Sequence, residues 1–468
     1  MKKKSLFNNL LPLPIEYIFI VLGLIFGILF IFINPPFQTN DEDRHFYAAY
    51  SISEGQFVPY NKNNMSGTPL PRNLVMITQS FQGIPFYQGT KINVEKMEQT
   101  FNMPLNEKDT VFNANPSLTT FPIPYFASAI GIKVGGIINS NPIWLNRFGR
   151  FGDLIMFLLI MFFAIRITPI FKSVFLLYGL TPMVIYQAAS VTYDTLSIAL
   201  TFFMIALFLK YALIKDSITR NDIIFIILLT LLHRFSKDGY VLIPFLVFII
   251  PPKKLGSKSM ISPFYIGFTL YFVLLYFLPG WTWNKFIASL NLLAAPGGIK
   301  DFVYGNPGFF SKIISEPFTA TGNMITSTLF QRQDFVGGII GRFGYSYTLM
   351  PKFFMIVHGL VLLSVAFFES KKEFLFSIQQ RVTIFLVGIG SIVLIIVGWY
   401  LSSPIGSTTI WGLQGRYFIP AIPIVLLLLY NNKFENPKWI KWKGVVIGLY
   451  IIISLIYTLI YMSDKFYV

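Results

Sequence analysis

The sequence contains no cysteine, so it can form no disulfide framework and offers no thiolate as a metal ligand or nucleophile. Charged residues make up only 12% of its 468 residues, whereas a soluble domain carries roughly 25%. Hydrophobic residues make up 54%, and 50 of them are phenylalanine. This composition excludes an ordinary soluble domain and indicates a polytopic membrane protein. The bias toward Lys, Ile, Asn and Phe favours a bacterial source.

The formal net charge of +16 would favour a nucleic-acid partner in a soluble protein. In a membrane protein, the enrichment of Lys and Arg in cytoplasmic loops explains the same charge. We therefore expect a lipid bilayer as the surroundings and no nucleic acid as a partner.

Long apolar runs recur along the whole chain, and a run of about 17–25 residues can cross a bilayer as a helix. The runs cover residues 15–33, 143–165, 173–190, 192–213, 222–235, 239–251, 262–279, 350–368, 382–401, 413–430 and 444–462. The sequence therefore predicts an all-α polytopic membrane protein with about eleven transmembrane helices. No internal repeat is evident, so we expect a single domain over residues 1–468.

The basic residues predict the orientation of these helices. If the N-terminus is cytoplasmic, about half of the 37 Lys and Arg residues fall in short inside loops, as the positive-inside rule requires. Two large segments, 34–142 and 280–348, then lie outside the cytoplasm. The apolar stretch 121–136 would invert every later loop if it crossed the membrane, so we expect it at the outer interface. The N-terminal Lys run and first apolar segment are expected to act as an uncleaved anchor in the bacterial cytoplasmic membrane.

Three consecutive carboxylates, Asp41, Glu42 and Asp43, follow the first apolar run in a chain that has only 21 acidic residues. The prolines Pro35 and Pro36 end the helix before them, which holds the acids at the membrane surface. Packed like charges raise one another's pKa and favour a carboxylate that accepts a proton. The same oxygens would suit a divalent cation. A solvated, helix-capping acidic turn is the alternative structural explanation.

Three further ionisable residues are expected at the same membrane face. Asp194 falls near the outer end of an apolar run, where a carboxylate usually lines a cavity or caps the next helix. Lys237, with Arg234, lies in an outer turn, either in a site or reaching the interface. Arg416 is the single basic residue between Arg381 and Lys433, and suits a phosphate or a pair with a local carboxylate.

The remaining candidates are weaker. Arg147 and Arg150, near the start of the second span, are expected to extend to the interface. His233 and His358 have no carboxylate or histidine at metal-ligand spacing and are expected to be packing residues. His45 adjoins the acidic cluster, although a histidine on a helix surface is the simpler interpretation.

Several motifs resemble, in order, a bacterial family of predicted multi-pass membrane proteins that is classed by a domain of unknown function. That family is related to the C-type (GT-C) glycosyltransferases. The matching motifs are Pro35-Pro36-Phe37 with Asp41-Glu42, His45-Phe46, Tyr50, Glu54-Gly55, Pro182-Met183, Ala189-Ser190 with Asp194, Ser236-Lys237 with Tyr240, Gly341 with Gly344, and Gln414–Pro420. In the family the acidic pair is usually followed by proline, whereas Asp43 and Arg44 follow it here.

The resemblance implies a GT-C-like bundle with two large extracytoplasmic loops, in which Asp41 would be the catalytic base or acceptor binder, Asp194 a second acid and Lys237 a phosphate contact. The other candidates are assigned from the chemistry and position of the residues themselves. The catalytic residues would be Asp41, Glu42 and Asp194, and the donor-phosphate ligands would be Lys237 and Arg416. The substrate-binding residues would be Asp43, His45, Gln414 and Tyr417. A metal ion, if the reaction uses one, would be held by Asp41, Glu42 and Asp43.

The expected function is a membrane glycosyltransferase that moves a sugar from a polyprenyl-phosphate donor to a cell-envelope glycan or lipid. A carboxylate base would activate the acceptor hydroxyl, and cations would stabilise the departing phosphate. The alternatives are a transporter or flippase for envelope precursors and a polymerase- or ligase-type assembly protein. Transporters often have internal repeats and midplane polar sites, which the sequence does not indicate.

Overall fold

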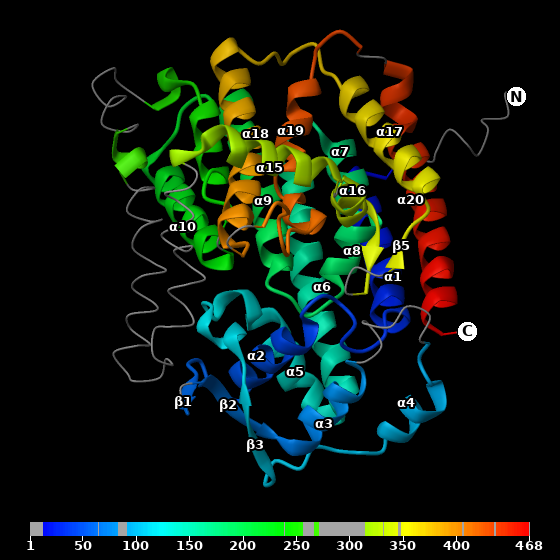
Figure 1. Ribbon diagram of the computed structural model, residues 1–468. Coiled ribbons are helices and arrows are strands. Elements are labelled where there is room, and N and C mark those ends of the chain that lie inside the picture. Colours follow the sequence, from blue (N-terminus) through cyan, green and yellow to red (C-terminus); the bar gives the residue numbers. More distant parts are fainter. Residues whose placement is uncertain are drawn as a thin grey trace, which may run out of the picture.

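The computed structural model describes residues 13–63, 65–82, 91–237, 239–255, 266–270, 314–330, 332–344, 348–404, 407–434 and 437–467. It is mostly helical. A bundle of apolar helices carries a smaller cap at one end, built from the segment between the first two long helices (Figure 1).

The bundle contains the long helices and several short ones. Its elements are α1 (Ile15–Ile33), α6 (Pro142–Ile167), α7 (Lys172–Gly179), α8 (Pro182–Ala188), α9 (Asp194–Leu213), α10 (Arg220–Ser236), η5 (Ile243–Ile249), η6 (Pro252–Leu255), α15 (Pro317–Phe330), α16 (Arg332–Ile340), β4 (Arg342–Phe343), β5 (Thr348–Leu349), α17 (Lys352–Phe368), α18 (Ile378–Ser402), η7 (Gly415–Phe418), α19 (Ile422–Leu426), η8 (Leu427–Leu429) and α20 (Pro437–Phe466).

The cap has its own hydrophobic core and a small sheet that the sequence did not lead us to expect. Its elements are α2 (Glu42–Ser53), β1 (Tyr60–Lys62), β2 (Met65–Pro71), α3 (Arg72–Ser80), α4 (Val94–Thr100), β3 (Thr110–Ala114), η3 (Pro116–Thr119), η4 (Ile123–Tyr125) and α5 (Phe126–Ile138). The three strands pair antiparallel in the order β1-β2-β3. The apolar stretch predicted at the interface forms η4 and α5, and α5 has 13 residues, fewer than the roughly 20 that a span requires.

Five described helices are long and apolar enough to cross a membrane, namely α1, α6, α9, α18 and residues Trp442–Phe466 of α20. The prediction of a multi-spanning helical membrane protein is therefore confirmed. The more detailed prediction of eleven regular spans is not. Of the predicted span 262–279, only residues 266–270 lie within the described residues.

Three predicted spans are interrupted or irregular. The run 173–190 is divided into α7 and α8 at Pro182, the run 239–251 forms the 3₁₀ helix η5, and the run 413–430 forms η7, α19 and η8. Proline lacks an amide donor and clashes with the preceding turn, so helical structure ends before Pro182 and before Pro420. Most of these residues are buried among other helices. That is the setting in which a membrane tolerates irregular backbone.

Glycine allows the first two long helices to approach closely. Gly23 and Gly27 lie four residues apart on one face of α1, opposite Leu158 and Leu154 of α6. A Cβ atom on either glycine would lie 2.4 to 2.5 Å from a leucine Cδ atom. Such contacts between small residues and larger side chains are typical of helix packing in membranes.

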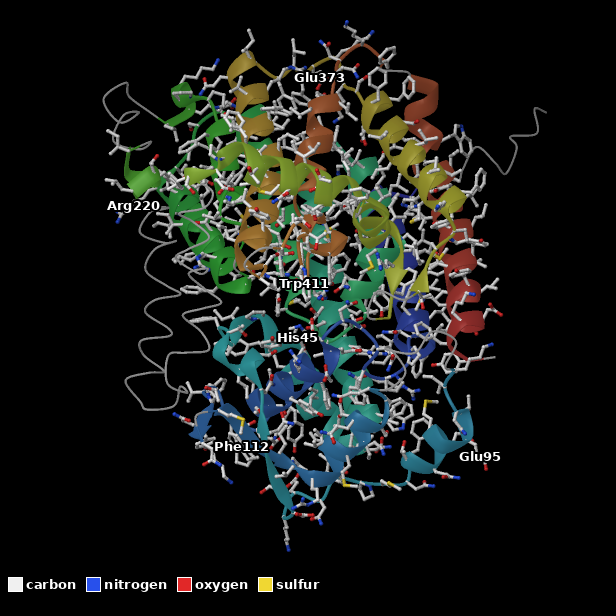
Figure 2. The ribbon with its side chains drawn as sticks, viewed as in Figure 1. His45, Glu95, Phe112, Arg220, Glu373 and Trp411 are labelled. Atoms are coloured by element: carbon white, nitrogen blue, oxygen red, sulfur yellow. The ribbon has the colours of Figure 1, made fainter. Side chains whose placement is uncertain are left out.

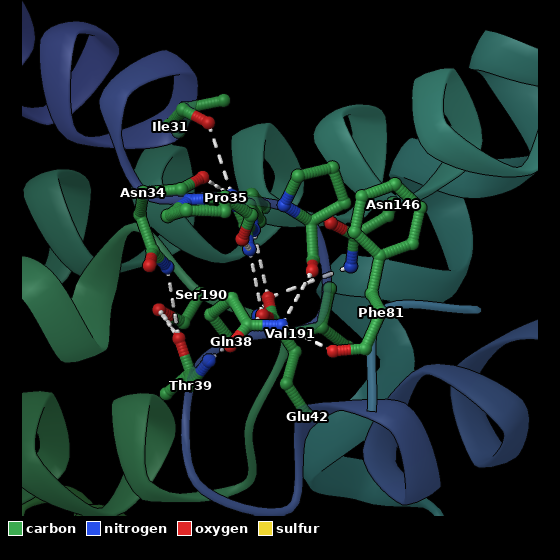
Figure 3. A network of polar contacts seen from close by, with 12 residues as sticks. Ile31, Asn34, Pro35, Gln38, Thr39, Glu42, Phe81, Asn146, Ser190 and Val191 are labelled. Carbon is green, nitrogen blue, oxygen red and sulfur yellow. Dashed lines mark hydrogen bonds and ion pairs between the residues drawn. The ribbon is translucent and has the colours of Figure 1, made fainter. Parts of the chain in front are cut away.

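A buried ion pair joins the bundle to the cap. The Arg150 guanidinium on α6 donates two hydrogen bonds of 2.7 Å to the Glu42 carboxylate at the start of α2 (Figure 3). It donates three more, of 2.6 to 3.0 Å, to the carbonyl oxygens of Ile31, Asn34 and Pro35. All five of its N–H donors are therefore used. Both side chains are at most 1% exposed, so the prediction that Arg150 extends to the interface is wrong.

The other contacts of Glu42 extend this network. Its carboxylate accepts hydrogen bonds from the backbone N–H of Thr39 and of Val191, the latter in the turn between α8 and α9. The Asn146 side chain of α6 is a further donor, at 3.4 Å. Together, Arg150 and Glu42 thus fix the end of α1, the start of α2 and the entry to α9 relative to α6.

Replacing Arg150 with methionine should destabilise the protein by about 3–5 kcal/mol, because the variant leaves the Glu42 charge buried without its partner. The free energy of unfolding in detergent measures this. Arg147→Met is the matched control. Arg147 is half-buried against the Trp144 ring, 4.8 Å away, and its loss should cost only about 1 kcal/mol.

The double variant Glu42→Gln/Arg150→Met removes both charges of this pair, so it leaves no unpaired charge there and should recover part of the lost stability. Equal destabilisation by Arg150→Met and Arg147→Met would contradict the central role of the Arg150–Glu42 pair.

Candidate functional site

The three consecutive acids of the first motif point to three different partners. Asp41 lies just before α2 with a positive φ of 60°, a conformation that aspartate adopts more readily than most residues. Its Oδ2 atom lies 3.4 Å from Nη2 of Arg416. Glu42 is held by Arg150, and Asp43 accepts a 2.7 Å hydrogen bond from the Gln82 side chain.

This divergence bears on two expectations. The carboxylates of Asp41, Glu42 and Asp43 contact different partners and do not share one site. They also do not form a joint ligand set. Within the described part of the chain, no three acidic, histidine or cysteine side chains come together in a way that could hold a metal ion.

The turn that carries Asp194 is held from beneath by two buried carboxylates. The Val191 N–H donates to Glu42, and the Thr192 N–H donates to Asp153 at 3.2 Å. The Thr192 hydroxyl then accepts a hydrogen bond from the Asp194 N–H. Asp194 follows the N-cap residue and is the first residue of α9. Its carboxylate contacts cations and does not cap the helix.

Four side chains form an ion-pair cluster, which we define as Asp41, Asp194, Lys237 and Arg416. The Asp194 carboxylate contacts the Lys237 ammonium and lies 3.3 Å from Nη1 of Arg416. The side chains of Asp194, Lys237 and Arg416 are 6%, 11% and 3% exposed, whereas that of Asp41 is 43% exposed. The structure thus brings together four residues that are up to 375 positions apart in the sequence, with one accessible carboxylate at the edge.

Aromatic rings surround the Lys237 ammonium. It lies 4.6 Å from the ring centres of both Tyr193 and Tyr417 and 5.8 Å from that of Tyr240. Tyr417 in turn stacks on Trp399, with the two ring planes 5° apart. Burial lowers the pKa of Lys237, and the neighbouring Asp194 carboxylate opposes this change. The rings therefore hold the ammonium in place while leaving it little access to water.

His45 is buried beside the cluster, so its interpretation as a helix-surface residue is wrong. Its Nδ1 atom shares a 2.7 Å hydrogen bond with the Tyr125 hydroxyl, and its ring meets the edge of Tyr193. Burial lowers the pKa of His45 to about 4, against the opposing effect of Asp41 and Asp194. The imidazole is therefore neutral at physiological pH.

A cavity of about 150 Å³ adjoins the cluster and is lined by Asn40, Gln414, Arg416 and Arg342, among others. The Gln414 side-chain oxygen accepts hydrogen bonds from Asn40 at 3.2 Å and from Arg416 at 2.8 Å. At roughly 30 Å³ per liquid water molecule, the cavity holds about five waters' volume, which suits a group the size of one sugar ring or phosphate.

Close backbone contact shapes one wall of this cavity. A Cβ atom on Gly415 would lie 2.1 Å from the Phe335 carbonyl oxygen of α16, so only glycine fits at this position. The contact seats the start of η7, and with it Arg416, directly against α16.

The cluster lies where the bundle meets the cap. Figure 2 labels His45 and Trp411 in this region, and Glu373 at the far end of the bundle. The helix boundaries place two members of the cluster at helix ends. Asp194 is the first residue of α9, and Lys237 follows the last residue of α10.

Sequence reasoning missed two residues that support the site. Asp153 is fully buried in α6 and also accepts a 2.8 Å hydrogen bond from the Ser128 hydroxyl. The sequence could have indicated Asp153, because an acid within a long apolar run is rare and usually functional. Arg150 could not have been assigned in this way, because its partners come from distant segments. His233 and His358, expected to pack, are buried and bond to hydroxyl groups.

Comparison with protein families gave one match. A family model described as a predicted membrane protein (DUF2142) covers residues 24–425, which include every member of the ion-pair cluster. No curated protein and no solved structure matched the chain.

The low pKa of His45 predicts a pH-dependent loss of stability. Below pH 6.5 the unfolded chain protonates His45, whereas the folded protein resists protonation down to about pH 4. Stability is therefore lost as the pH falls through this window, by about 3 kcal/mol in total.

The stability difference between wild type and His45→Asn isolates this effect, because both proteins keep the other histidines. We expect the advantage of the wild type in free energy of unfolding to shrink by about 2–3 kcal/mol between pH 7.5 and 4.5. A difference that stays constant over that range would refute the assignment.

Proposed function

The chain belongs to the DUF2142 family of predicted membrane proteins, and we propose that it is a membrane glycosyltransferase of the GT-C type. It transfers a sugar from a polyprenyl-phosphate donor to a cell-envelope glycan or lipid acceptor. The observation that carries this proposal is the ion-pair cluster, in which one accessible carboxylate lies beside two buried cations at the rim of a small cavity.

The accessible carboxylate fits the role of general base. Asp41 is the one acid of the first motif that faces the cluster, since Glu42 is fully engaged by Arg150 and Asp43 by Gln82. Asp41 accepts the proton of the acceptor hydroxyl as the oxygen attacks the anomeric carbon of the sugar. Glu42, expected from the sequence to share this role, instead positions the turn of Asp194.

The cations fit the role of phosphate ligands. As the bond between the anomeric carbon and the phosphate oxygen breaks, negative charge builds up on the departing polyprenyl phosphate. Arg416 and Lys237 stabilise that charge, and they do so strongly because both are buried. Asp194 balances them before the donor arrives. The attack comes from the face opposite the phosphate, so the configuration at the anomeric carbon is inverted.

The sugar fits the cavity beside Arg416. The side-chain amides of Gln414 and Asn40 offer hydrogen bonds to hydroxyl groups there. Tyr417 forms an aromatic platform next to both cations. The His45 ring meets the edge of the Tyr193 ring. Its role is to hold Tyr193 in place beside Lys237 while remaining neutral.

The distribution of basic residues supports an extracytoplasmic site. Short loops at the ends of helices far from the cap carry Lys172, Lys215, Arg220, Lys253, Lys254, Lys371, Lys372 and Lys433. By the positive-inside rule, that end faces the cytoplasm of a bacterial cell, and the cap with the ion-pair cluster faces outward. Nucleotide sugars are absent outside the membrane, so a lipid-linked sugar is the natural donor.

Asp41→Asn should abolish sugar transfer while leaving a folded, membrane-inserted protein, because an amide cannot accept the hydroxyl proton at neutral pH. The measurement is mass spectrometry of envelope glycans from cells that carry the wild type, the variant or a deletion. Glycans from Asp41→Asn cells should match those of the deletion.

Asp109→Asn is the control, since it makes the same change at an exposed carboxylate of the cap, outside the cluster. It should retain the wild-type glycans. Unaltered glycans in Asp41→Asn cells would remove Asp41 as the base. Identical glycans with and without the whole protein would overturn the proposed function itself.

A further inference from the structure

A second cavity lies at the other end of the bundle, far from the ion-pair cluster. Its volume is about 440 Å³, within the range of about 300–1,000 Å³ that small-molecule sites occupy. Most of its wall is apolar and comes from Val365 and Phe368 of α17, Ile447 of α20, and Phe434. The cavity lies beside the last residues of α17. Glu373, a few residues later in the sequence, appears at the end of the bundle opposite the cap (Figure 2).

The helices that line this cavity also expose apolar side chains to the surroundings of the protein. Leu363 and Phe367 on α17 are 49% and 40% exposed, and Val446 on α20 is 45% exposed. Exposed apolar helix surfaces of this kind face lipid in a membrane protein. The cavity is therefore lined by two helices, α17 and α20, that also carry lipid-facing side chains.

One side of the cavity is polar. The Glu369 carboxylate accepts hydrogen bonds from the backbone N–H groups of Ser173 and Val174 at the start of α7, and Lys443 donates to it at 3.0 Å. The Ser173 side chain lines the cavity and is 1% exposed, and its hydroxyl has no hydrogen-bond partner among the residues that the structure describes. A buried hydroxyl without a partner costs free energy unless a ligand supplies one.

The charge near this polar side favours an anionic ligand. Because backbone N–H groups already stabilise the Glu369 charge, Lys443 keeps donors for a second anion. Among the side chains that the structure describes, the segments next in sequence add Lys371, Lys372 and Lys433, all exposed, and one exposed acid, Glu373. Together with Lys443 and Glu369, these described residues carry an excess of two positive charges.

We propose that this cavity binds an anionic phospholipid, with one acyl chain between α17 and α20 and the headgroup phosphate at Lys443 and Ser173. The apolar wall accommodates the chain, and the lysines attract the phosphate as basic residues near a membrane surface do. The site is separate from the ion-pair cluster, so it holds whether or not the protein transfers sugars.

The test uses the full-length protein in neutral detergent, mixed with equal amounts of phosphatidylglycerol and phosphatidylcholine that have the same acyl chains. After gel filtration, mass spectrometry counts each retained lipid. Wild type should retain phosphatidylglycerol over phosphatidylcholine by at least about fivefold, roughly the effect of one lysine near an anionic headgroup. Excess inorganic phosphate should not displace the lipid, because phosphate lacks the chain.

Two variants separate the headgroup from the chain. Glu369→Gln/Lys443→Gln removes both charges without leaving either one buried alone, and the preference for phosphatidylglycerol should fall to about one. Ser364→Trp places an indole at the lining of the cavity and should remove most retention of both lipids. Ser402→Trp makes the same change at an exposed site at the end of α18 and should behave as wild type.

Unfolding midpoints establish that each variant is folded before lipids are counted. Equal retention of the two lipids by the wild type overturns the proposal, as does full retention by folded Ser364→Trp. Displacement of the lipid by phosphate alone would show an anion site without a chain site and would also overturn it.

Discussion

The buried pair of Arg150 and Glu42 is the interaction on which the rest of the structure depends. Two charges taken out of water are stable only when every donor and acceptor finds a partner, and here the partners come from four separate segments. The guanidinium closes the end of α1, where helix carbonyls otherwise lack donors. The carboxylate fixes the start of α2 and the turn before α9. Asp41 precedes Glu42, and Asp194 follows the turn that Glu42 holds. The Arg150–Glu42 pair therefore sets the distance between Asp41 and Asp194.

The scarcity of charge made much of the candidate site predictable. In a chain with so few charged residues, Asp41, Asp194, Lys237 and Arg416 stand out against the apolar runs, and each is expensive to bury without a purpose. The different partners of Asp41, Glu42 and Asp43 were not predictable. Glu42 and Asp43 are successive helix residues, whose side chains point about 100° apart, and Asp41 precedes the helix with a positive φ, so the three side chains reach different partners. Which of them meets Arg150 or Arg416 depends on packing between distant segments.

The same limit applies to the fold. Hydropathy identified α1, α6, α9 and α18 closely, because long helices that cross a membrane need apolar residues over most of their length. It could not show that 173–190 and 413–430 are broken, since apolarity reports burial and not backbone regularity. Those segments are enclosed by other helices, where irregular backbone is tolerated. The cap sheet was missed for the opposite reason: its strands are short, polar and half exposed, with no apolar pattern to reveal them.

Charge balance explains why the irregular segments and the cluster occur together. The tight turn before Asp194 and the 3₁₀ turn of η7 bring Asp194 and Arg416 to 3.3 Å, which two regular helices would not readily allow. Asp194 then offsets the charges of Lys237 and Arg416 inside a poorly hydrated site, where attraction is strong and an unpaired ion is costly. Arg416 is shared with Asp41, the one member that water reaches. Any anion that enters must therefore compete with Asp41 for Arg416, and binding it would release the carboxylate beside it.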